Sequence, residues 1–310
     1  MIIGIIGNGN HSKRIQKILK NKKKIFIIYK PKAPNYFDKK EFDKIKKCKT
    51  IFITSPNKTH YFYIKKLWLN RYLFCEKPPV VKKNELIFLK SLSHKKIYFN
   101  FNFRFSMIAK IIANIKNYNL GKLIYINKIV THGLALKDDY KKNWRSNKMS
   151  NQYGIFEMVL IHYLDLINYF YKVKKIKNLK MINISQNGTS YDTCKLSFEI
   201  GKNLVADFYA TYSSPLYKKF LILFTNGYIE QIENKIFIYG PAKNLDKNGL
   251  FKKPKIIKQY KLNQTKDYQN SLEESIHYFL DHSDNKKTFN KKMFIKSLES
   301  TSLMINGKNY

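Results

Sequence analysis

The first hundred residues alternate short apolar runs with amphipathic patterns, and this alternation restricts the fold more than any other feature of the sequence. Five β-rich runs, IIGII, KIFIIY, TIFIT, YLFCE and IYFNF, are separated by helical patterns near residues 10–21, 38–47, 58–69 and 82–93. Strands that alternate with helices form βαβ units, which predict a parallel sheet with helices on both faces. The runs are apolar throughout, as is typical of strands buried on both faces.

The pattern changes beyond about residue 119. Long alternating runs follow, such as KLIYINKIVTH, YDTCKLSFEI, KNLVADFYATY and KFLILFT. They predict a large, open, mostly antiparallel sheet. Helical patterns interrupt or close this sheet near residues 154–171, 266–282 and 290–304. We therefore expect an α/β protein with a Rossmann-type, doubly wound domain over residues 1–118 and an α+β domain over residues 119–310.

The balance of positive and negative residues bears on whether the protein binds nucleic acid or a membrane. The 310 residues include 59 Lys and Arg against 21 Asp and Glu, which gives a formal net charge of +38. Such a charge attracts nucleic acid or anionic membranes. However, only four of these cations are Arg, and abundant Lys with Ile, Asn, Phe and Tyr is typical of an AT-rich genome. Because Arg is preferred for bidentate phosphate and guanine contacts, we expect neither nucleic acid nor a membrane as partner.

The cysteines and the start of the sequence argue against a disulfide-stabilised, a metal-binding or a membrane-spanning protein. Cys48, Cys75 and Cys194 lie far apart, with no CxxC or Cys/His cluster, so neither a disulfide framework nor a metal site is expected. Met1 leads directly into an apolar strand pattern, and no run reaches the ~18 apolar residues that a spanning helix needs. These features predict a cytoplasmic protein.

The first apolar run leads into a glycine turn, Gly7-Asn8-Gly9-Asn10-His11-Ser12. Gly7 permits a tight turn, Gly9 lets a pyrophosphate approach the backbone at a helix N-terminus, and Ser12 is small enough for close packing of the helix on the strand. Its place between a strand and a helix makes this pattern typical of dinucleotide binding. We therefore predict cofactor contacts at Gly7, Gly9, Asn10, His11 and Ser12; a plain strand-to-helix turn is the alternative.

The choice between NAD and NADP is expected to depend on residues about twenty positions further on. There the sequence reads Tyr29-Lys30-Pro31-Lys32, and no carboxylate occurs before Asp38. Lys30 and Lys32 suit a ribose 2′-phosphate, although Lys is common throughout the chain. The sequence thus predicts NAD or NADP as cofactor, with a slight preference for NADP.

Two further polar segments follow the third and fourth apolar runs. They are Ser55-Pro56-Asn57 with Thr59-His60, and Cys75-Glu76-Lys77-Pro78. Open α/β sheets bind ligands at the carboxyl ends of their parallel strands. We therefore expect cofactor contacts from Ser55, Pro56, Asn57, His60, Glu76 and Lys77.

At these segments the sequence resembles the Gfo/Idh/MocA family, named after glucose–fructose oxidoreductase, inositol dehydrogenase and a rhizopine-catabolism protein. TIFITSPNKTHYFYI and YLFCEKPPV are similar to the TPNxxH and EKP segments of that family. The family also has an Arg after a strand, a Trp-containing loop and an HxxD helix, which match Arg104, Trp144-Arg145 and His162 with Asp165. The similarity covers the first 170 residues in the same order.

The resemblance implies an NAD(P)-dependent oxidoreductase that acts on a sugar, a sugar nucleotide or a polyol, in surface-carbohydrate biosynthesis. It implies that Lys77 lies beside the nicotinamide and donates a hydrogen bond to the substrate oxygen, while His162 exchanges the proton. It also makes Arg104, Trp144, Arg145 and Asp165 candidate substrate contacts, along with Lys77 and His162. Asp138 and Asp139 in the long loop are weaker candidates.

One departure from the family pattern concerns the helix that carries His162. The family has a carboxylate four residues before this histidine, where the present sequence has Met158; Glu157, one residue earlier, faces about 100° away on an α-helix. Three interpretations stay open: His162 acts alone, Lys77 and water share the proton transfer, or the protein binds cofactor without turnover. A redox-neutral, NAD-using sugar lyase or glycosidase and a non-catalytic dinucleotide-binding regulator are therefore alternatives to a sugar dehydrogenase or reductase.

The second predicted sheet suggests self-association. Its many long strands offer one face to two short helices, and the other face has no evident cover. An uncovered, half-apolar sheet face is typical of an interface. We expect a homodimer or a homotetramer.

Overall fold

The computed structural model describes residues 2–31, 38–201, 203–241 and 245–307. The chain forms two compact units. One unit comprises the chain up to Asn102 together with Leu272–Asn306, and the other comprises Phe103–Ser271 together with Gly307.

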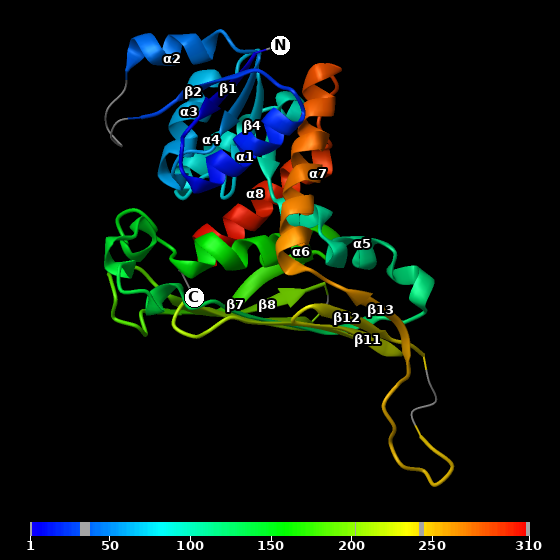
Figure 1. Ribbon diagram of the computed structural model, residues 1–310. Coiled ribbons are helices and arrows are strands. Elements are labelled where there is room, and N and C mark those ends of the chain that lie inside the picture. Colours follow the sequence, from blue (N-terminus) through cyan, green and yellow to red (C-terminus); the bar gives the residue numbers. More distant parts are fainter. Residues whose placement is uncertain (1, 32–37, 202, 242–244, 308–310) are drawn as a thin grey trace. The chain divides into compact units, whose positions relative to one another are not determined.

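The first unit is built on a five-stranded parallel sheet in the order β2-β1-β3-β4-β5 (Figure 1). Its strands are β1 (Ile3–Ile6), β2 (Phe26–Tyr29), β3 (Thr50–Ile53), β4 (Tyr72–Glu76) and β5 (Ile97–Asn100). Its helices are α1 (Asn10–Asn21), α2 (Lys39–Lys46), α3 (His60–Leu67), α4 (Lys83–Ser91), most of α7 (Gln264–Asp284) and α8 (Lys291–Asn306). Every residue of β1 and β3 is buried, which confirms the prediction of parallel strands covered on both faces.

Helices α7 and α8 cover opposite faces of this sheet. The ring of Phe279 in α7 lies 5.0 Å from that of Phe52 and 6.1 Å from that of Tyr98. The ring of Phe294 in α8 stacks on Phe99 at 5.5 Å. Tyr98 and Phe99 are consecutive residues of β5, so their side chains point to opposite faces of the sheet. The aromatic core of the first unit is therefore closed by the C-terminal helices.

The division of the chain differs from the expected one at two places. Residues 272–306 belong to the first unit, not to the second, and the second unit begins at Phe103 instead of residue 119. The physical reason for the first difference is the packing of Phe279 and Phe294 on the parallel sheet. The period of a helical pattern indicates that a helix has an apolar face, but not which sheet that face covers.

The second unit contains an eight-stranded sheet in the order β13-β12-β11-β10-β6-β9-β8-β7 (Figure 1). Neighbouring strands are antiparallel, except that β6 and β9 are parallel. The strands are β6 (Leu123–Thr131), β7 (Val173–Ile182), β8 (Thr193–Ile200), β9 (Leu204–Thr211), β10 (Tyr217–Phe224), β11 (Gly227–Ile232), β12 (Lys235–Tyr239) and β13 (Ile256–Lys261). Helices α5 (Met107–Ala113) and α6 (Ile161–Phe170) also belong to this unit. The predicted open, mostly antiparallel sheet is thus confirmed.

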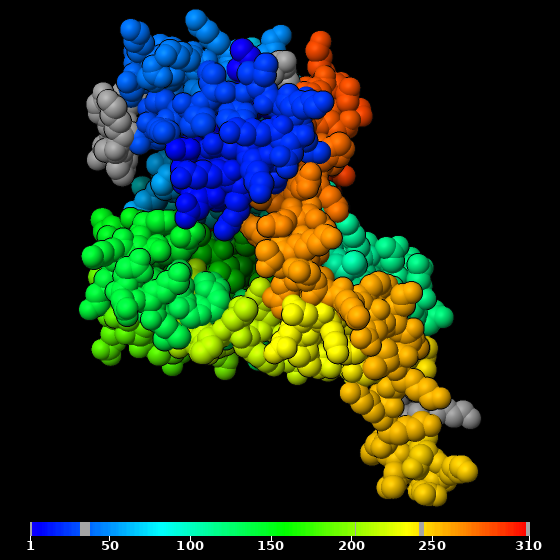
Figure 2. Space-filling view, in the orientation of Figure 1, coloured from blue at the N-terminus to red at the C-terminus, as the bar shows by residue number. Residues whose placement is uncertain are grey.

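The loop between β12 and β13 projects from this sheet (Figure 1 and Figure 2). Near its turn, the Asp246 carboxylate accepts hydrogen bonds from the backbone N–H groups of Asn248 and Leu250. The neighbouring Phe251 side chain is 91% exposed. The turn therefore has a fixed hydrogen-bonding pattern while it presents an apolar ring to solvent.

One lysine lies on the buried face of the large sheet. Lys128 in β6 is 1% exposed, and its Nζ lies 4.4 Å from the centre of the Tyr163 ring and 5.2 Å from that of Phe220. Burial and the charge of Lys218 lower the pKa of Lys128 to about 7. Cation–π contacts thus offset only part of the desolvation of this ammonium group.

We predict that Lys128→Met stabilises the protein at pH 7. The pKa of Lys128 in the folded state lies below its usual value of 10.5, so the unfolded chain binds more protons between pH 7 and 10.5, and stability rises with pH in that window. The variant should gain at most about 5 kcal/mol at pH 7 and lose this contribution to the pH dependence. Urea unfolding of parent and variant at pH 7 and pH 9 measures both effects; an unchanged difference between the two pH values would contradict the prediction.

Candidate active site

The turn after β1 requires glycine at position 7. Gly7 has φ +106°, and a Cβ on it would lie 2.8 Å from the backbone carbonyl of Thr54. The Ser12 hydroxyl donates a 2.9 Å hydrogen bond to the Gly7 carbonyl, and Ser12 is completely buried. Ser12 therefore fixes the turn against the first helix, as its small size predicts.

Gly9 precedes α1 and lies beside open space. Its backbone is extended, with φ −73° and ψ 177°, and a Cβ on it would meet no atom within 4 Å. Helix α1 begins at Asn10, has no acidic residue in its first turn and no capping side chain among the described residues. Its first N–H groups and the positive end of its dipole suit an anion. The structure thus fits a phosphate group at Gly9, Asn10 and His11.

His11 joins this turn to the end of β4. Its Nε2 lies 2.7 Å from Oε1 of Glu76, and the Asn100 amide donates a 2.7 Å hydrogen bond to the same oxygen. Burial alone would raise the pKa of Glu76, but His11, Asn100 and Lys77 lower it below its usual value. The Ser275 hydroxyl in turn donates to Oδ1 of Asn100. The negative charge of Glu76 is therefore retained inside the first unit beside the glycine turn.

His60 joins the other two predicted segments. Its Nε2 lies 2.9 Å from the Ser55 carbonyl, and its Nδ1 lies 2.9 Å from the Pro78 carbonyl. Burial lowers the pKa of His60. The loop after β3 and the loop after β4 are thus joined through one imidazole ring. Ser55 and Asn57 are buried in this region.

Lys77 and Lys30 each follow a strand of the parallel sheet, and two other strands lie between those two. Lys77 comes directly after Glu76 at the end of β4 and is 8% exposed. Lys30 comes directly after β2 and is exposed. Asp38, the first carboxylate after this strand, accepts a hydrogen bond from the Glu41 N–H and caps α2. Lys32 lies outside the described residues.

The helix that carries His162 is preceded by a π-helical turn. Residues Phe156–Leu160 are π-helical, and the N–H of Ile161 donates to the carbonyl of Phe156, five residues earlier. An α-helical reading places Glu157 about 100° away from the position of Met158. In a π turn, hydrogen bonds join residues five apart, so the angle around the helix between residues 157 and 162 is smaller than an α-helical reading gives.

Glu157 is buried and His162 is partly exposed. The Glu157 side chain is fully buried, and its Oε2 accepts a 3.2 Å hydrogen bond from the Tyr153 N–H. The ring of His162 stacks on Phe103, with 4.5 Å between ring centres and 23° between the planes. A carboxylate and an imidazole, five residues apart, are thus both held in this segment.

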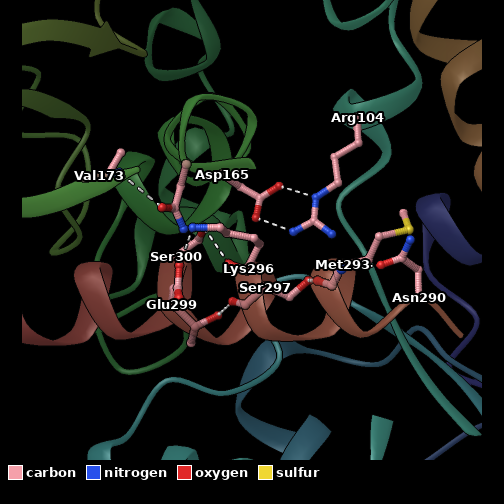
Figure 3. A network of polar contacts seen from close by, with 11 residues as sticks. Arg104, Asp165, Val173, Asn290, Met293, Lys296, Ser297, Glu299 and Ser300 are labelled. Atoms are coloured by element: carbon pink, nitrogen blue, oxygen red, sulfur yellow. Dashed lines mark hydrogen bonds and ion pairs between the residues drawn. The ribbon is translucent and has the colours of Figure 1, made fainter. Parts of the chain in front are cut away.

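Arg104 and Asp165 are paired with each other. The guanidinium donates two hydrogen bonds to the carboxylate, from Nε at 2.8 Å and from Nη2 at 2.6 Å (Figure 3). The side chains are 2% and 1% exposed, and the Arg104 guanidinium also lies 4.9 Å from the Tyr169 ring centre. Because removing one partner of a buried pair leaves an uncompensated charge, this geometry favours a structural role. Their contact with substrate stays a prediction.

The loop that contains Trp144 and Arg145, called the Trp loop, lies in the second unit between β6 and α6. Trp144 is 39% exposed, and the Arg145 guanidinium lies 4.6 Å from the centre of its ring. Asp138 and Asp139 are exposed. Lys77 belongs to the first unit and His162 to the second.

Sequence reasoning missed several polar residues beside the Trp loop. Tyr140 and Tyr212 are 2% and 1% exposed, and the ring of His132 lies 4.6 Å from that of Tyr212. These residues belong to no recognisable motif, and Tyr is common throughout the chain, so residue type alone did not distinguish them. The position of His132 and Tyr212 immediately after two long strands could have indicated them.

Neither a metal centre nor a membrane span is found in the described ranges. Within them, no group of three or more His, Cys, Asp or Glu side chains is placed to hold a metal ion. The same part of the chain has no helix that is long and apolar enough to cross a membrane.

The fold is similar to those of solved oxidoreductases over almost the whole chain. A levoglucosan dehydrogenase in complex with NADH and levoglucosan has a TM-score of 0.77 and 15% identity, covering 98% of this chain and 95% of that one. A myo-inositol dehydrogenase from Corynebacterium glutamicum has a TM-score of 0.73 and 16% identity, covering 100% and 96%. The chain therefore shares its fold with these dehydrogenases.

A third structure with this fold is described as an NADPH-dependent oxidoreductase from Desulfitobacterium hafniense. It has a TM-score of 0.74 and 14% identity, and the match covers 100% of this chain and 94% of that one. No protein-family model and no curated protein sequence matches the chain. At 14–16% identity, the likeness to these structures shows the fold.

Proposed function

We propose that the protein is an NAD(P)-dependent oxidoreductase that transfers hydride between a nicotinamide and a carbon of a sugar, a sugar nucleotide or a polyol. The observation that carries this proposal is the glycine turn after β1, where Gly7 is sterically required and Gly9 faces open space at a helix N-terminus. The fold shared with levoglucosan and myo-inositol dehydrogenases supports it. A place in surface-carbohydrate biosynthesis rests on the sequence resemblance alone.

The first unit would hold the cofactor. Its pyrophosphate would lie at Gly9, Asn10 and His11, because the N-terminus of α1 has no acidic side chain in its first turn and binds anions through N–H groups and the helix dipole. Lys30 would meet the adenosine ribose or its 2′-phosphate, and this favours NADP slightly. The remaining candidate contacts come from the loops after β3 and β4, at Ser55, Pro56, Asn57, His60, Glu76 and Lys77.

The residues of this chain would position the substrate and move its proton. When bound, the nicotinamide accepts or donates the hydride. Lys77 would donate a hydrogen bond to the substrate oxygen and stabilise the negative charge that develops there. His162 would take the hydroxyl proton in oxidation and return it in reduction. The ring stack on Phe103 would hold this imidazole in one orientation.

Glu157 would serve as the carboxylate that assists His162. The proposal is supported by the π-helical turn, which reduces the angle around the helix between the two residues, and by the burial of Glu157, which would strengthen its effect on the imidazole. Met158 therefore no longer argues against catalysis. The non-catalytic regulator rested on Met158, and no observation in the described residues favours it or the redox-neutral lyase over a dehydrogenase.

We predict a contrast between two glycine variants. Gly7→Val should fail to fold, because its Cβ would lie 2.8 Å from the Thr54 backbone, whereas Gly9→Val should fold, because its Cβ meets no atom. Gly9→Val should raise the Kd for both NADH and NADPH at least about tenfold, or 1.4 kcal/mol. Nicotinamide fluorescence gives the affinities, and circular dichroism checks the fold.

A folded Gly9→Val protein with parental affinity for both nucleotides would overturn the cofactor assignment. In the parent, NADPH should bind at least as tightly as NADH. An NADH preference of tenfold or more would contradict the role given to Lys30 without affecting the glycine turn.

We predict that Lys77 and His162 matter more for turnover than for substrate binding. On a substrate found by screening free and nucleotide-linked sugars, Lys77→Ala should lower kcat roughly 10²- to 10³-fold, and His162→Ala roughly 10²-fold. Glu157→Gln should move the acid limb of the oxidation rate profile to lower pH, because a carboxylate stabilises the protonated imidazole. Met158→Leu is the matched control and should leave the profile unchanged.

These roles fail if Lys77→Ala and His162→Ala both keep parental turnover. The role of Glu157 fails separately if Glu157→Gln and Met158→Leu have the same pH profile as the parent. Both comparisons use steady-state rates between pH 5 and 9.

We also propose that the outer face of the large sheet forms a homodimer or homotetramer interface. The side chains of β6, β9 and β10 alternate between buried and partly exposed positions, and the exposed set includes apolar groups such as Val205, 40% exposed. Replacing Leu221 and Leu223 by Lys should dissociate the assembly, because unpaired charges oppose burial. Light scattering measures the mass, and a monomeric parent at micromolar concentration would contradict the proposal.

A further inference from the structure

A polar cluster lies at the carboxyl ends of β6 and β9 in the second unit. These strands are parallel, and their last residues, Thr131 and Thr211, are register partners. The next residues, His132 and Tyr212, therefore leave the sheet side by side, with 4.6 Å between their ring centres. The ring of Tyr140 lies 6.4 Å from that of Tyr212.

The hydroxyl of Tyr140 is buried without a partner. Tyr140 is 2% exposed, and among the described residues no group forms a hydrogen bond with its hydroxyl. Such a group costs about 1–3 kcal/mol when it is left unsatisfied. Burial and the charge of Asp192 raise the pKa of Tyr140 to about 12, although Arg145 opposes this shift. The phenol is therefore a neutral hydrogen-bond donor that has no acceptor in the described part of the chain.

Arg145 supplies a positive charge to the same cluster. Its charge opposes the rise in the pKa of Tyr140 and of Tyr212, and it contributes to the lowered pKa of His132, after burial and Lys218. Its guanidinium stacks on Trp144, and in the described ranges it donates no hydrogen bond to any residue. The planar face of Arg145 is thus supported by Trp144, and its positive charge acts on all three side chains of the cluster.

Two carboxylates of this unit, those of Asp192 and Glu157, accept hydrogen bonds from backbone N–H groups. The Asp192 carboxylate accepts hydrogen bonds from the N–H groups of Ile184 and Ser185, at 2.9 and 2.8 Å. The Glu157 carboxylate accepts one from Tyr153. Neither forms an ion pair with Arg145 in the part of the chain that the structure describes. Arg145 is therefore available to an anion from outside the chain.

We propose that Arg145 and the Tyr140 hydroxyl bind an oxyanion carried by the substrate, so that the substrate is an acidic sugar bearing a carboxylate or a phosphate instead of a neutral polyol. This inference rests on the proposed function of the site. A guanidinium offers paired N–H donors that match two oxygens of one anion, and a neighbouring phenol can donate to the same group. Trp144, 39% exposed, offers an apolar surface beside it for the sugar ring.

Binding to the full chain tests this, measured by titration calorimetry with saturating NADH. The probes are D-glucuronate for a carboxylate, D-glucose 6-phosphate for a phosphate, and D-glucose as the neutral comparison. At least one anionic sugar should bind tenfold or more tightly than D-glucose, and the tighter of the two identifies the source of the oxyanion. Equal affinities for all three, or no binding of any of them by a chain that binds NADH, would overturn the proposal.

Variants test whether Arg145 and Tyr140 cause the preference for anionic sugars. Arg145→Met should remove at least tenfold of the affinity for the anionic sugar and leave that for D-glucose unchanged. Arg145→Lys should restore only part of the loss, and Tyr140→Phe should cost threefold to tenfold. Lys142→Met removes one exposed charge from the same loop and should have no effect. An anion preference that survives both Arg145→Met and Tyr140→Phe in folded proteins would refute the assignment.

The failure of this inference can be separated from failure of the proposed function. Binding of NADH is measured independently by fluorescence, and the second unit contributes none of the residues at the glycine turn. A chain that binds NADH but prefers neutral sugars keeps the oxidoreductase proposal and loses the oxyanion site. A chain that does not bind NADH loses the oxidoreductase proposal itself.

Discussion

The organisation of the second unit depends on one pairing, that of β6 with β9. Parallel strands cannot be joined by a tight hairpin, so the chain must cross over between them. That crossover contains the Trp loop, the π-helical turn, α6, and the antiparallel strands β7 and β8. The same pairing brings His132 and Tyr212 together at one edge of the sheet. Trp144, Arg145, His162 and Asp165 therefore lie on segments that the parallel pair requires, whereas Arg104 precedes β6.

Features that depend on local sequence could be predicted well. The five apolar runs became β1–β5, because a strand buried on both faces must be apolar along its whole length. The glycine turn could also be predicted. A side chain at position 7 would clash with the backbone of Thr54, which follows the neighbouring strand β3, so the turn requires glycine there. In both cases the determining interactions are those of a recurrent strand-turn-helix unit.

Features that depend on distant contacts could not be predicted. The π-helical turn before α6 has no marker in its own residues, so the sequence predicts an ordinary α-helix there. The alternation in β6 predicts a strand but not its parallel partner β9. Strand β13 has no regular alternation, because five of its six residues are exposed. The pairing of Arg104 with Asp165 joins residues 61 positions apart, which no spacing rule indicates.

The scarcity of arginine gives the few that occur a physical meaning. Four of the 59 cations of this chain are Arg, and two of them, Arg104 and Arg71, form hydrogen bonds through two or more guanidinium nitrogens. Arg104 needs a planar fork to hold Asp165 with two hydrogen bonds, and Arg71 uses its fork on the backbone carbonyls of Lys46 and Leu69. Lysine cannot reproduce this geometry. Arg145 would use the same planar geometry to donate paired hydrogen bonds to the proposed oxyanion.

The closure of the first sheet by α7 and α8 determines the order in which the protein can mature during synthesis. Strands β1–β5 are complete at Asn100, but Phe279 and Phe294, which cover their two faces, emerge only after the whole second unit has been made. Until then the nascent chain carries an apolar parallel sheet without two of its covering helices, a state that is prone to aggregation. The ribosome must therefore finish almost the entire chain before the nucleotide-type unit can reach its native core.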